Sequence, residues 1–417
     1  MVPITKAIPV LTLVCSIGLA HHNPMQMAST EKPVALYPGL GTWTHPIATR
    51  APEAQRYFDQ GLTLMYGFNR YEASRSFRKA LEIDPHAVMA KWGLAMALGP
   101  YLNMDGDPDV HLQESCRVAK AALSSEEGTA TERVWLESAA ARCPDYSEPQ
   151  KYVTAMRSLA AHFPDDPDAQ TLFAESLLVP VRWHFYTPDG KPAEGVQEAQ
   201  RVLEAVLRRY PNHPGANHFY IHAVEQSPTP ERAVPSAQRL MGIVPLAGHM
   251  VHMPGHIWLA LGDYDTAVAV NERAIQVDRD YFIKTGVMSG YLQMNYPHSL
   301  MFILYARAMQ GRVAETRKAI DMMRTSLASM VPDMVTVGEM YTAFIEVRMG
   351  MWDELLAAPK PKGPNSLFTA MWHYARALAA FGEGRRADAE REQQHFEELR
   401  KSFDRNMEWH DAAKTVK

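Results

Sequence analysis

Residues 54–85 read AQRYFDQGLTLMYGFNRYEASRSFRKALEIDP, a stretch whose small, aromatic and proline residues follow the spacing of a pair of helices. With Ala54 as position 1, the landmarks are Gly61 at position 8, Ala73 at 20, Phe77 at 24, Ala80 at 27 and Pro85 at 32. The small residues allow two antiparallel helices to approach closely, and the aromatic ring fills the remaining space. Proline ends the second helix because it lacks an N–H and clashes with the preceding turn. The stretch therefore predicts a helix hairpin.

The same landmarks recur along most of the chain, which indicates a repeat with a period of about 34 residues. The clearer copies are residues 261–278, 310–320, 349–358 and 383–396, and the weaker ones are residues 88–100, 132–144, 166–178 and 215–245. The alternating pattern that is typical of strands does not occur in the sequence. We therefore expect an all-α helical-repeat domain over residues 51–410, built of about eight or nine helix pairs.

This pattern resembles the tetratricopeptide repeat (TPR). The resemblance implies a right-handed α-solenoid superhelix, in which the first helix of each pair lines a concave groove. It also implies that positions 2, 5, 9 and 12 or 13 of each repeat point into that groove. The phrases WGLAMALGP, ANHFYIHAVE and GHMVHMPGHIWLALGDY, with the first repeat, are similar to those of a broad bacterial group of exported TPR proteins that has no assigned activity.

The composition indicates which partners the protein can bind, and the N-terminal sequence indicates where the protein is located. The 417 residues are 47% hydrophobic and 21% charged, and the net charge of −5 indicates no basic surface for nucleic acid. Residues 1–20 are similar to a secretory signal peptide, with a lysine before a short apolar run that ends in small residues. That run is shorter than a membrane span, and no later run is long enough. We expect an exported protein, periplasmic or secreted, without a membrane span.

Three further expectations concern segments outside the repeats. Residues 21–50 are predicted to form an irregular arm, and residues 411–417 a tail. The aromatic insertion at residues 180–195 is expected to be a loop, either a lid or a packed connection. Cys116 and Cys143 remain after signal cleavage and can form one disulfide in an oxidising compartment.

Histidines concentrate in the middle of the chain, and the repeat register places them on one face of successive inner helices. The groove positions of the repeats that begin at Pro214, Gly248 and Pro297 hold His218, His222, Glu225, His249, His252, His256 and His298. Glu175 takes position 9 of an earlier repeat, and Tyr305 takes position 9 of the repeat with His298. His45 joins this group only if the arm folds back, and His213 is predicted to lie in a turn.

This arrangement predicts a transition-metal site. Two histidines at i and i+4 lie on one helix face and can both bind one ion, as His218/His222 and His252/His256 do in this register. Glu225 is the candidate catalytic group, as a general base, a metal ligand or an acceptor that fixes a ring tautomer. Copper is the first candidate because methionines accompany the histidines, and zinc or iron come next. Such a site suits a metal-dependent oxidoreductase, or less readily a hydrolase, acting on a small molecule or peptide in the groove.

The alternative is a scaffold without enzymatic activity that binds a peptide or a partner protein in its groove. The sequence contains no Ser-His-Asp signature, no glycine-rich phosphate loop and no HExxH motif, so no reaction is identified. A metal site requires ring nitrogens of several histidines to converge to within about 4 Å, given metal–nitrogen bonds of about 2.1 Å. A scaffold leaves the rings pointing apart along the groove.

Overall fold

The structure is a computed structural model that describes residues 31–103, 109–125, 127–144, 146, 148–361 and 366–401. The predicted signal peptide, residues 21–30 of the arm and the predicted tail lie outside the described residues. All regular structure in the described part of the chain is helical, apart from one isolated β-bridge between Tyr186 and Pro192. The predicted all-α fold class is thus confirmed, whereas the handedness of the superhelix and the number of helix pairs stay predictions.

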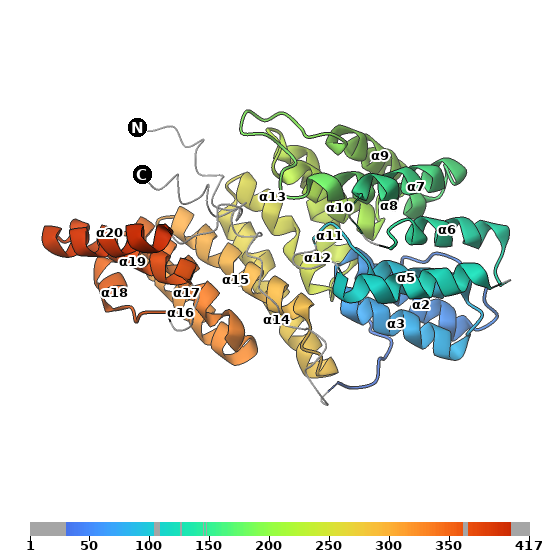
Figure 1. Ribbon diagram of the computed structural model, residues 1–417, viewed down its shortest axis with the longest axis horizontal. Coiled ribbons are helices and arrows are strands. Elements are labelled where there is room, and N and C mark those ends of the chain that lie inside the picture. Colours follow the sequence, from blue (N-terminus) through green and yellow to red (C-terminus); the bar gives the residue numbers. More distant parts are fainter. Residues whose placement is uncertain are drawn as a thin grey trace. The chain divides into compact units, whose positions relative to one another are not determined.

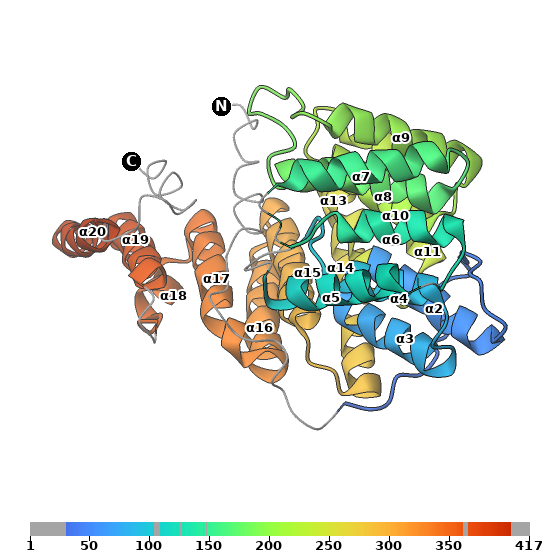
Figure 2. The ribbon, with the colours of Figure 1, turned by 45° about the vertical axis from the view of Figure 1, so that its right-hand side comes forward.

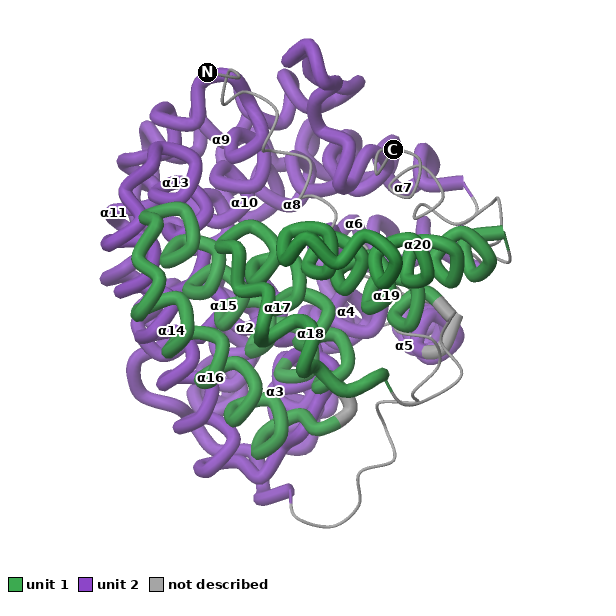
Figure 3. The backbone as a smooth tube through the Cα atoms, turned by 90° about the vertical axis from the view of Figure 1, so that its left-hand side faces the viewer, with its two compact units in different colours: residues 1–16, 292–417 green, residues 17–291 purple. Residues whose placement is uncertain are grey.

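The chain divides into two compact units (Figure 3). We call the described residues up to 291 the N-terminal unit and the described residues from 292 onward the C-terminal unit. The histidines of interest lie in the N-terminal unit, with the exception of His298.

The N-terminal unit consists of helices joined by short turns. They are α2 (Pro52–Tyr66), α3 (Arg70–Ile83), α4 (Val88–Leu98), α5 (Asp109–Ser124), α6 (Ala130–Ala140), α7 (Pro149–His162), α8 (Pro167–Leu178), η2 (Val179–Val181), α9 (Val196–Arg209), α10 (Pro214–Glu225), η3 (Pro230–Ala233), α11 (Val234–Ile243), α12 (Gly248–His252), α13 (Pro254–Ala260) and α14 (Tyr264–Thr285). Successive helices pack side by side, for example α2 on α3 and α8 on α9 (Figures 1 and 2).

The C-terminal unit continues this pattern of packed helices. Its elements are α15 (Gly290–Met309, whose first two residues belong to the N-terminal unit), α16 (Val313–Met330), η4 (Pro332–Met334), α17 (Val335–Met349), α18 (Trp352–Ala357), α19 (Ser366–Gly382) and α20 (Arg386–Arg400). Helix α19 packs on both α18 and α20.

The first repeat shows why its landmark residues are needed. The buried ring of Phe77 on α3 lies against α2 and α4. A Cβ atom on Gly61 of α2 would lie 2.7 Å from this ring, and one on Gly93 of α4 would overlap it too. Glycine at both positions therefore makes room for the aromatic ring, and the hairpin is TPR-like in the contact between positions 8 and 24.

The arm and the aromatic insertion both pack on the N-terminal unit. Residues 31–50 have no regular secondary structure, and the Tyr37 hydroxyl donates a hydrogen bond to Glu72 at 2.8 Å. In the insertion, Phe185 is buried and the Tyr186 hydroxyl donates to the carbonyl oxygen of Ala223 on α10 at 3.1 Å. The insertion is therefore a packed connection.

Cys116 on α5 and Cys143 after α6 form a disulfide, as the sequence allows. Among the described residues, no helix combines the length and the apolar character that crossing a bilayer requires.

Candidate metal centre

Five histidines and one glutamate from three helices meet inside the N-terminal unit, and we call them the histidine cluster. They are His218, His222 and Glu225 on α10, His249 and His252 on α12, and His256 on α13. Helix α10 packs on α13, which follows directly after α12. The predicted i, i+4 pairs do share a helix face, since the ring centroids are 4.8 Å apart in His218/His222 and also in His252/His256.

Pro254 divides the stretch that carries His249, His252 and His256 into two helices. Helix α12 ends at His252 and α13 begins at Pro254, although Met253 between them keeps a right-handed helical conformation. The interruption arises because proline has no N–H to donate to the carbonyl group of Met250. The sequence predicted a single helix here, so the structure corrects this detail while leaving the three histidines on neighbouring turns.

The first group of the cluster consists of His218, His222 and His249. One ring nitrogen from each lies within 4.8 Å of the other two. The Nε2 atoms of His218 and His249 are 3.2 Å apart, close to the separation of about 3.3 Å between two nitrogens bound to one tetrahedral ion. All three residues are buried. The group therefore brings three histidine nitrogens near the spacing of ligands around one ion, and His218 and His249 already have it.

The second group consists of His252 and His256. Their Nε2 atoms face each other at 2.9 Å. His252 is buried, whereas 11% of the His256 side chain is exposed. The second group therefore lies at the more accessible end of the cluster.

Acceptors outside the cluster set the orientation of two of the rings. Nδ1 of His218 donates to the carbonyl oxygen of Tyr66 at 2.5 Å, because that oxygen can only accept. Nδ1 of His252 donates to Oδ1 of Asn271 at 2.6 Å, and the amide of Asn271 is oriented by donating to Ala267. In their neutral forms both rings thus turn an unprotonated Nε2 toward the cluster, as metal-binding histidines do.

Glu225 connects the two groups. Its Oε1 accepts a hydrogen bond from Nδ1 of His222 at 3.0 Å, and its Oε2 pairs with Nδ1 of His256. Burial by itself would raise the pKa of Glu225, but the facing His256 and His222 hold this pKa well below its usual range. Of the three roles that the sequence left open for Glu225, this geometry matches the acceptor that fixes ring tautomers.

Burial also acts on the histidines. Burial, with the nearby His222, lowers the pKa of His218 well below its usual value. The Nε2 atom of His222 is buried and has no hydrogen-bond partner among the described residues. The interior of the first group therefore disfavours a charged imidazole at His218 and leaves a buried nitrogen of His222 available to a ligand.

The turn between α2 and α3 encloses the cluster. Phe68 has a φ of 57°, a left-handed conformation that is rare for an aromatic residue. Its ring centroid lies 4.5 Å from that of His218 and 5.2 Å from that of His249. The rings therefore face a packed interior, which differs from the open concave groove that the TPR resemblance implies, because this turn occupies the space in front of them.

His45 lies in a different polar centre, around the buried carboxylate of Asp168 on α8. Four side chains approach this carboxylate: Trp43 Nε1 at 3.0 Å, His45 Nδ1 at 2.9 Å, Tyr66 OH at 2.6 Å and His213 Nε2 at 3.2 Å. The arm does fold back, but it brings His45 to Asp168 and not to the histidine cluster. A buried carboxylate offers the imidazole a strong charge-assisted hydrogen bond, which explains this placement.

Four candidates remain: His213, Glu175, His298 and Tyr305. His213, predicted in a turn, caps the start of α10 by accepting from the Ala216 N–H at 3.0 Å. Glu175 is buried on α8 and accepts from the Leu102 N–H at 2.8 Å, so its carboxylate serves local packing and not the histidine cluster. His298 and Tyr305 lie on α15 in the C-terminal unit. Their place in the groove of the site remains a prediction from the repeat register.

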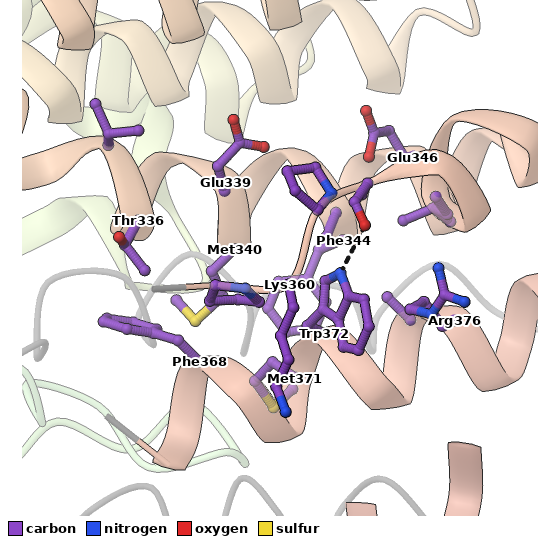
Figure 4. A pocket seen from close by; sticks show the side chains of 17 residues that line it. Thr336, Glu339, Met340, Phe344, Glu346, Lys360, Phe368, Met371, Trp372 and Arg376 are labelled. Atoms are coloured by element: carbon purple, nitrogen blue, oxygen red, sulfur yellow. Dashed lines mark hydrogen bonds between the residues drawn. The ribbon is translucent and has the colours of Figure 1, made fainter. Parts of the chain in front are cut away.

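The C-terminal unit contains a separate cavity of about 300 Å³ between α17, α18 and α19 (Figure 4). Its walls are largely apolar and are formed in part by Met340, Phe344, Phe368, Met371 and Trp372. Trp372 is held in place by a hydrogen bond of 3.1 Å from its Nε1 to the carbonyl oxygen of Ala358. The sequence did not indicate this cavity. Apolar residues that line a cavity and apolar residues of a packed core recur with the same helical period.

No known protein family matches the sequence, and no curated protein matches it. Solved structures with weak similarity include the following three. The APC/C hetero-tetramer Cut9-Hcn1 is 13% identical with a TM-score of 0.30, over 87% of this chain and 76% of that one. Naa15/Naa10 bound to HypK-THB is 13% identical with a TM-score of 0.25, over 84% and 59%. The TPR domain of P58(IPK) is 11% identical with a TM-score of 0.22, over 87% and 97%. Similarity at this level extends to neither the site nor the function.

Proposed function

We propose that the histidine cluster binds a transition metal. The observation that carries the proposal is the pair of close contacts between ring nitrogens, at 3.2 Å in His218/His249 and 2.9 Å in His252/His256. Where neither of two facing nitrogens carries a proton, their lone pairs repel each other at such distances. A cation between them removes this repulsion, and a metal ion does so at neutral pH without requiring a buried imidazolium.

Copper is the metal we propose first, with zinc or iron next. Imidazole nitrogens suit all three metals, and divalent copper binds such ligands most strongly. Both oxygens of Glu225 already pair with imidazoles, so the available ligands are mainly nitrogen.

For the same reason we propose an oxidoreductase before a hydrolase. A metal-dependent hydrolase needs a base that takes a proton from water, and both oxygens of Glu225 already contact imidazoles. The reaction partner is proposed to be a small molecule that approaches from the side of His256.

An exported location fits this proposal. The signal-like residues 1–20 and the disulfide between Cys116 and Cys143 both agree with an oxidising compartment. Sequencing the N-terminus of the protein from its own cells tests this point, since export requires that residues 1–20 be removed.

The test of metal binding is the metal content of untagged protein, measured by inductively coupled plasma mass spectrometry. We expect copper, zinc or iron at one or more equivalents per chain in the wild type, and a loss of that metal in a His222→Ala/His249→Ala variant. His86→Ala is the matched control, because His86 is exposed and pairs with Glu127 away from the cluster. A wild type that stays free of metal after incubation with each of the three ions would refute the proposal.

The C-terminal cavity favours a second function, binding of an apolar side chain of a peptide or partner protein. Its aromatic and methionine walls resemble those of peptide-binding pockets. Panning a library of displayed peptides on the protein tests this function. Phe344→Arg is expected to abolish the selected binding and Phe381→Ala to preserve it, since Phe381 is exposed and outside the cavity.

A further inference from the structure

We propose that the histidine cluster holds two metal ions, one in each group, with Glu225 as the carboxylate that joins them. This inference rests on the proposed metal binding and adds to it the number of ions and the role of Glu225. The first ion is assigned to His218, His222 and His249, and the second to His252 and His256.

The contacts of Glu225 separate the two ions. Nδ1 of His222 and Nδ1 of His256 both pair with this one carboxylate, each with a different oxygen. In an imidazole ring the two nitrogens point in roughly opposite directions. The Nε2 atoms of His222 and His256 therefore point away from the shared carboxylate, toward different centres, and one ion does not reach both.

The shortest contacts between ring nitrogens agree with this division. Nitrogens on one ion lie at most about 4.2 Å apart, twice the metal–nitrogen bond length. The Nε2 contacts of 3.2 Å and 2.9 Å each lie within one group. The ring centroids do not divide the cluster, since they are 5.9 Å apart in His222/His256 and 5.7 Å in His249/His252, between the groups, and 6.2 Å in His222/His249, within the first group. Neighbouring rings thus form one continuous row, with a close pair of ring nitrogens in each group.

The charge of Glu225 suits this role. Its carboxylate lies between two imidazoles, and only 9% of the side chain is exposed. A buried negative charge between two cations reduces their mutual repulsion, and its hydrogen bonds make the rings of His222 and His256 better ligands. Glu225 is therefore a positioning residue for both ions.

The two ions are expected to differ in affinity. All three histidines of the first group are buried, whereas His256 of the second group is partly exposed. Titration of the metal-free protein with copper(II), and separately with zinc(II), should show two steps that end at two ions per chain. The weaker step should disappear in a His252→Gln/His256→Gln variant, and the tighter step in a His218→Gln/His249→Gln variant.

Each outcome of this titration has a distinct meaning. Saturation of the wild type at one ion overturns the two-ion inference and leaves metal binding intact, whereas no binding at all overturns both. Loss of all metal in both double variants shows one shared centre and also overturns the inference. The wild-type stoichiometry needs no variant, and circular dichroism with a His45→Gln control identifies any variant that fails to fold.

A Glu225→Gln variant tests the joining role directly. The amide keeps the shape but loses the charge and one acceptor. We expect both binding steps to weaken, by about 10-fold or more, with both ions still bound at high metal concentration. An effect on only one of the two steps would contradict the joining role.

Discussion

Asn271 occupies the repeat position that Phe77 fills in the first repeat. Counted from Gly248, Asn271 is at position 24 and Gly255 at position 8, as Phe77 and Gly61 are when counted from Ala54. A Cβ on Gly255 would lie 2.5 Å from the Asn271 amide nitrogen, so the same close contact is kept with a polar side chain. The amide oxygen then orients His252. This departure from the repeat pattern is a sequence signal for the site that periodicity alone did not reveal.

Replacing Asn271 by leucine is expected to weaken metal binding. The substitution removes the acceptor of the His252 Nδ1–H, and such losses typically cost about 10–100-fold in metal affinity. Competition with a chelator of known affinity measures this change. Asn217→Leu is the matched control, because Asn217 is equally buried but donates to the carbonyl oxygens of Pro211 and His213 outside the cluster. A larger effect in the control would contradict the assigned role.

The polar centre at Asp168 is expected to make stability depend on pH in two windows. Burial opposes the charge of His45, but Asp168 outweighs it and raises the pKa of His45. The stabilisation by protonated His45 is fully present below the pKa of histidine in the unfolded chain, about 6.5, and it is lost as the pH rises through the raised pKa of the folded protein. The pKa of Asp168 is held far below its usual range by His213 and His45 against burial. The stabilisation by ionised Asp168 is fully present above about pH 4, and it declines as the pH falls further.

Urea unfolding of the metal-free protein between pH 5 and pH 8 checks the first window. His45→Gln should flatten the loss of stability that the wild type shows as the pH rises above about 6.5. Asp168→Asn should remove the dependence of stability on pH in this range. It should also lower the free energy of unfolding by roughly 3–5 kcal/mol, as expected when one partner of a buried pair is removed. An unchanged slope in both variants would contradict this assignment.

At the level of helices, the packing of Phe77 between two glycines should dominate the stability of the first repeat. Phe77→Ala leaves a cavity between α2, α3 and α4 and is expected to cost about 3–5 kcal/mol in the free energy of unfolding. Denaturant unfolding measures this loss, with Phe381→Ala as a control whose exposed ring should contribute little. A cost below about 1 kcal/mol would show that the site collapses around the missing ring.

The helices also explain how the predicted pairs of histidines come to lie side by side. The i, i+4 pairs of α10 and of α12 with α13 keep a common face even across the interruption at Pro254. The groups that surround the cluster lie on other elements. They are the backbone carbonyl of Tyr66, the aromatic ring of Phe68 and an amide on α14. Helical periodicity does not report such contacts, because it describes one helix at a time.

At the level of the whole molecule, the disulfide is expected to stabilise the N-terminal unit without affecting the cluster. Cys116 and Cys143 are separated by 27 residues, and a Cys116→Ala/Cys143→Ala variant should lose about 2–4 kcal/mol in the free energy of unfolding. Metal content should stay unchanged, because neither cysteine contacts a residue of the cluster in the described part of the chain. Thermal unfolding and metal analysis of the same sample check both statements, and a loss of metal would contradict the second.

The all-α class, the helix hairpins and the sharing of a helix face by pairs of histidines follow from the sequence, because each depends on residue spacing within about one repeat. The burial of the cluster, the placement of His45 at Asp168 and the link through Glu225 follow only from the tertiary structure. The contact between Tyr66 and His218 joins residues 152 positions apart, and that between His45 and Asp168 joins residues 123 apart. Contacts over such separations depend on how the helices stack and how the turns between them fill space, and no local periodicity encodes them.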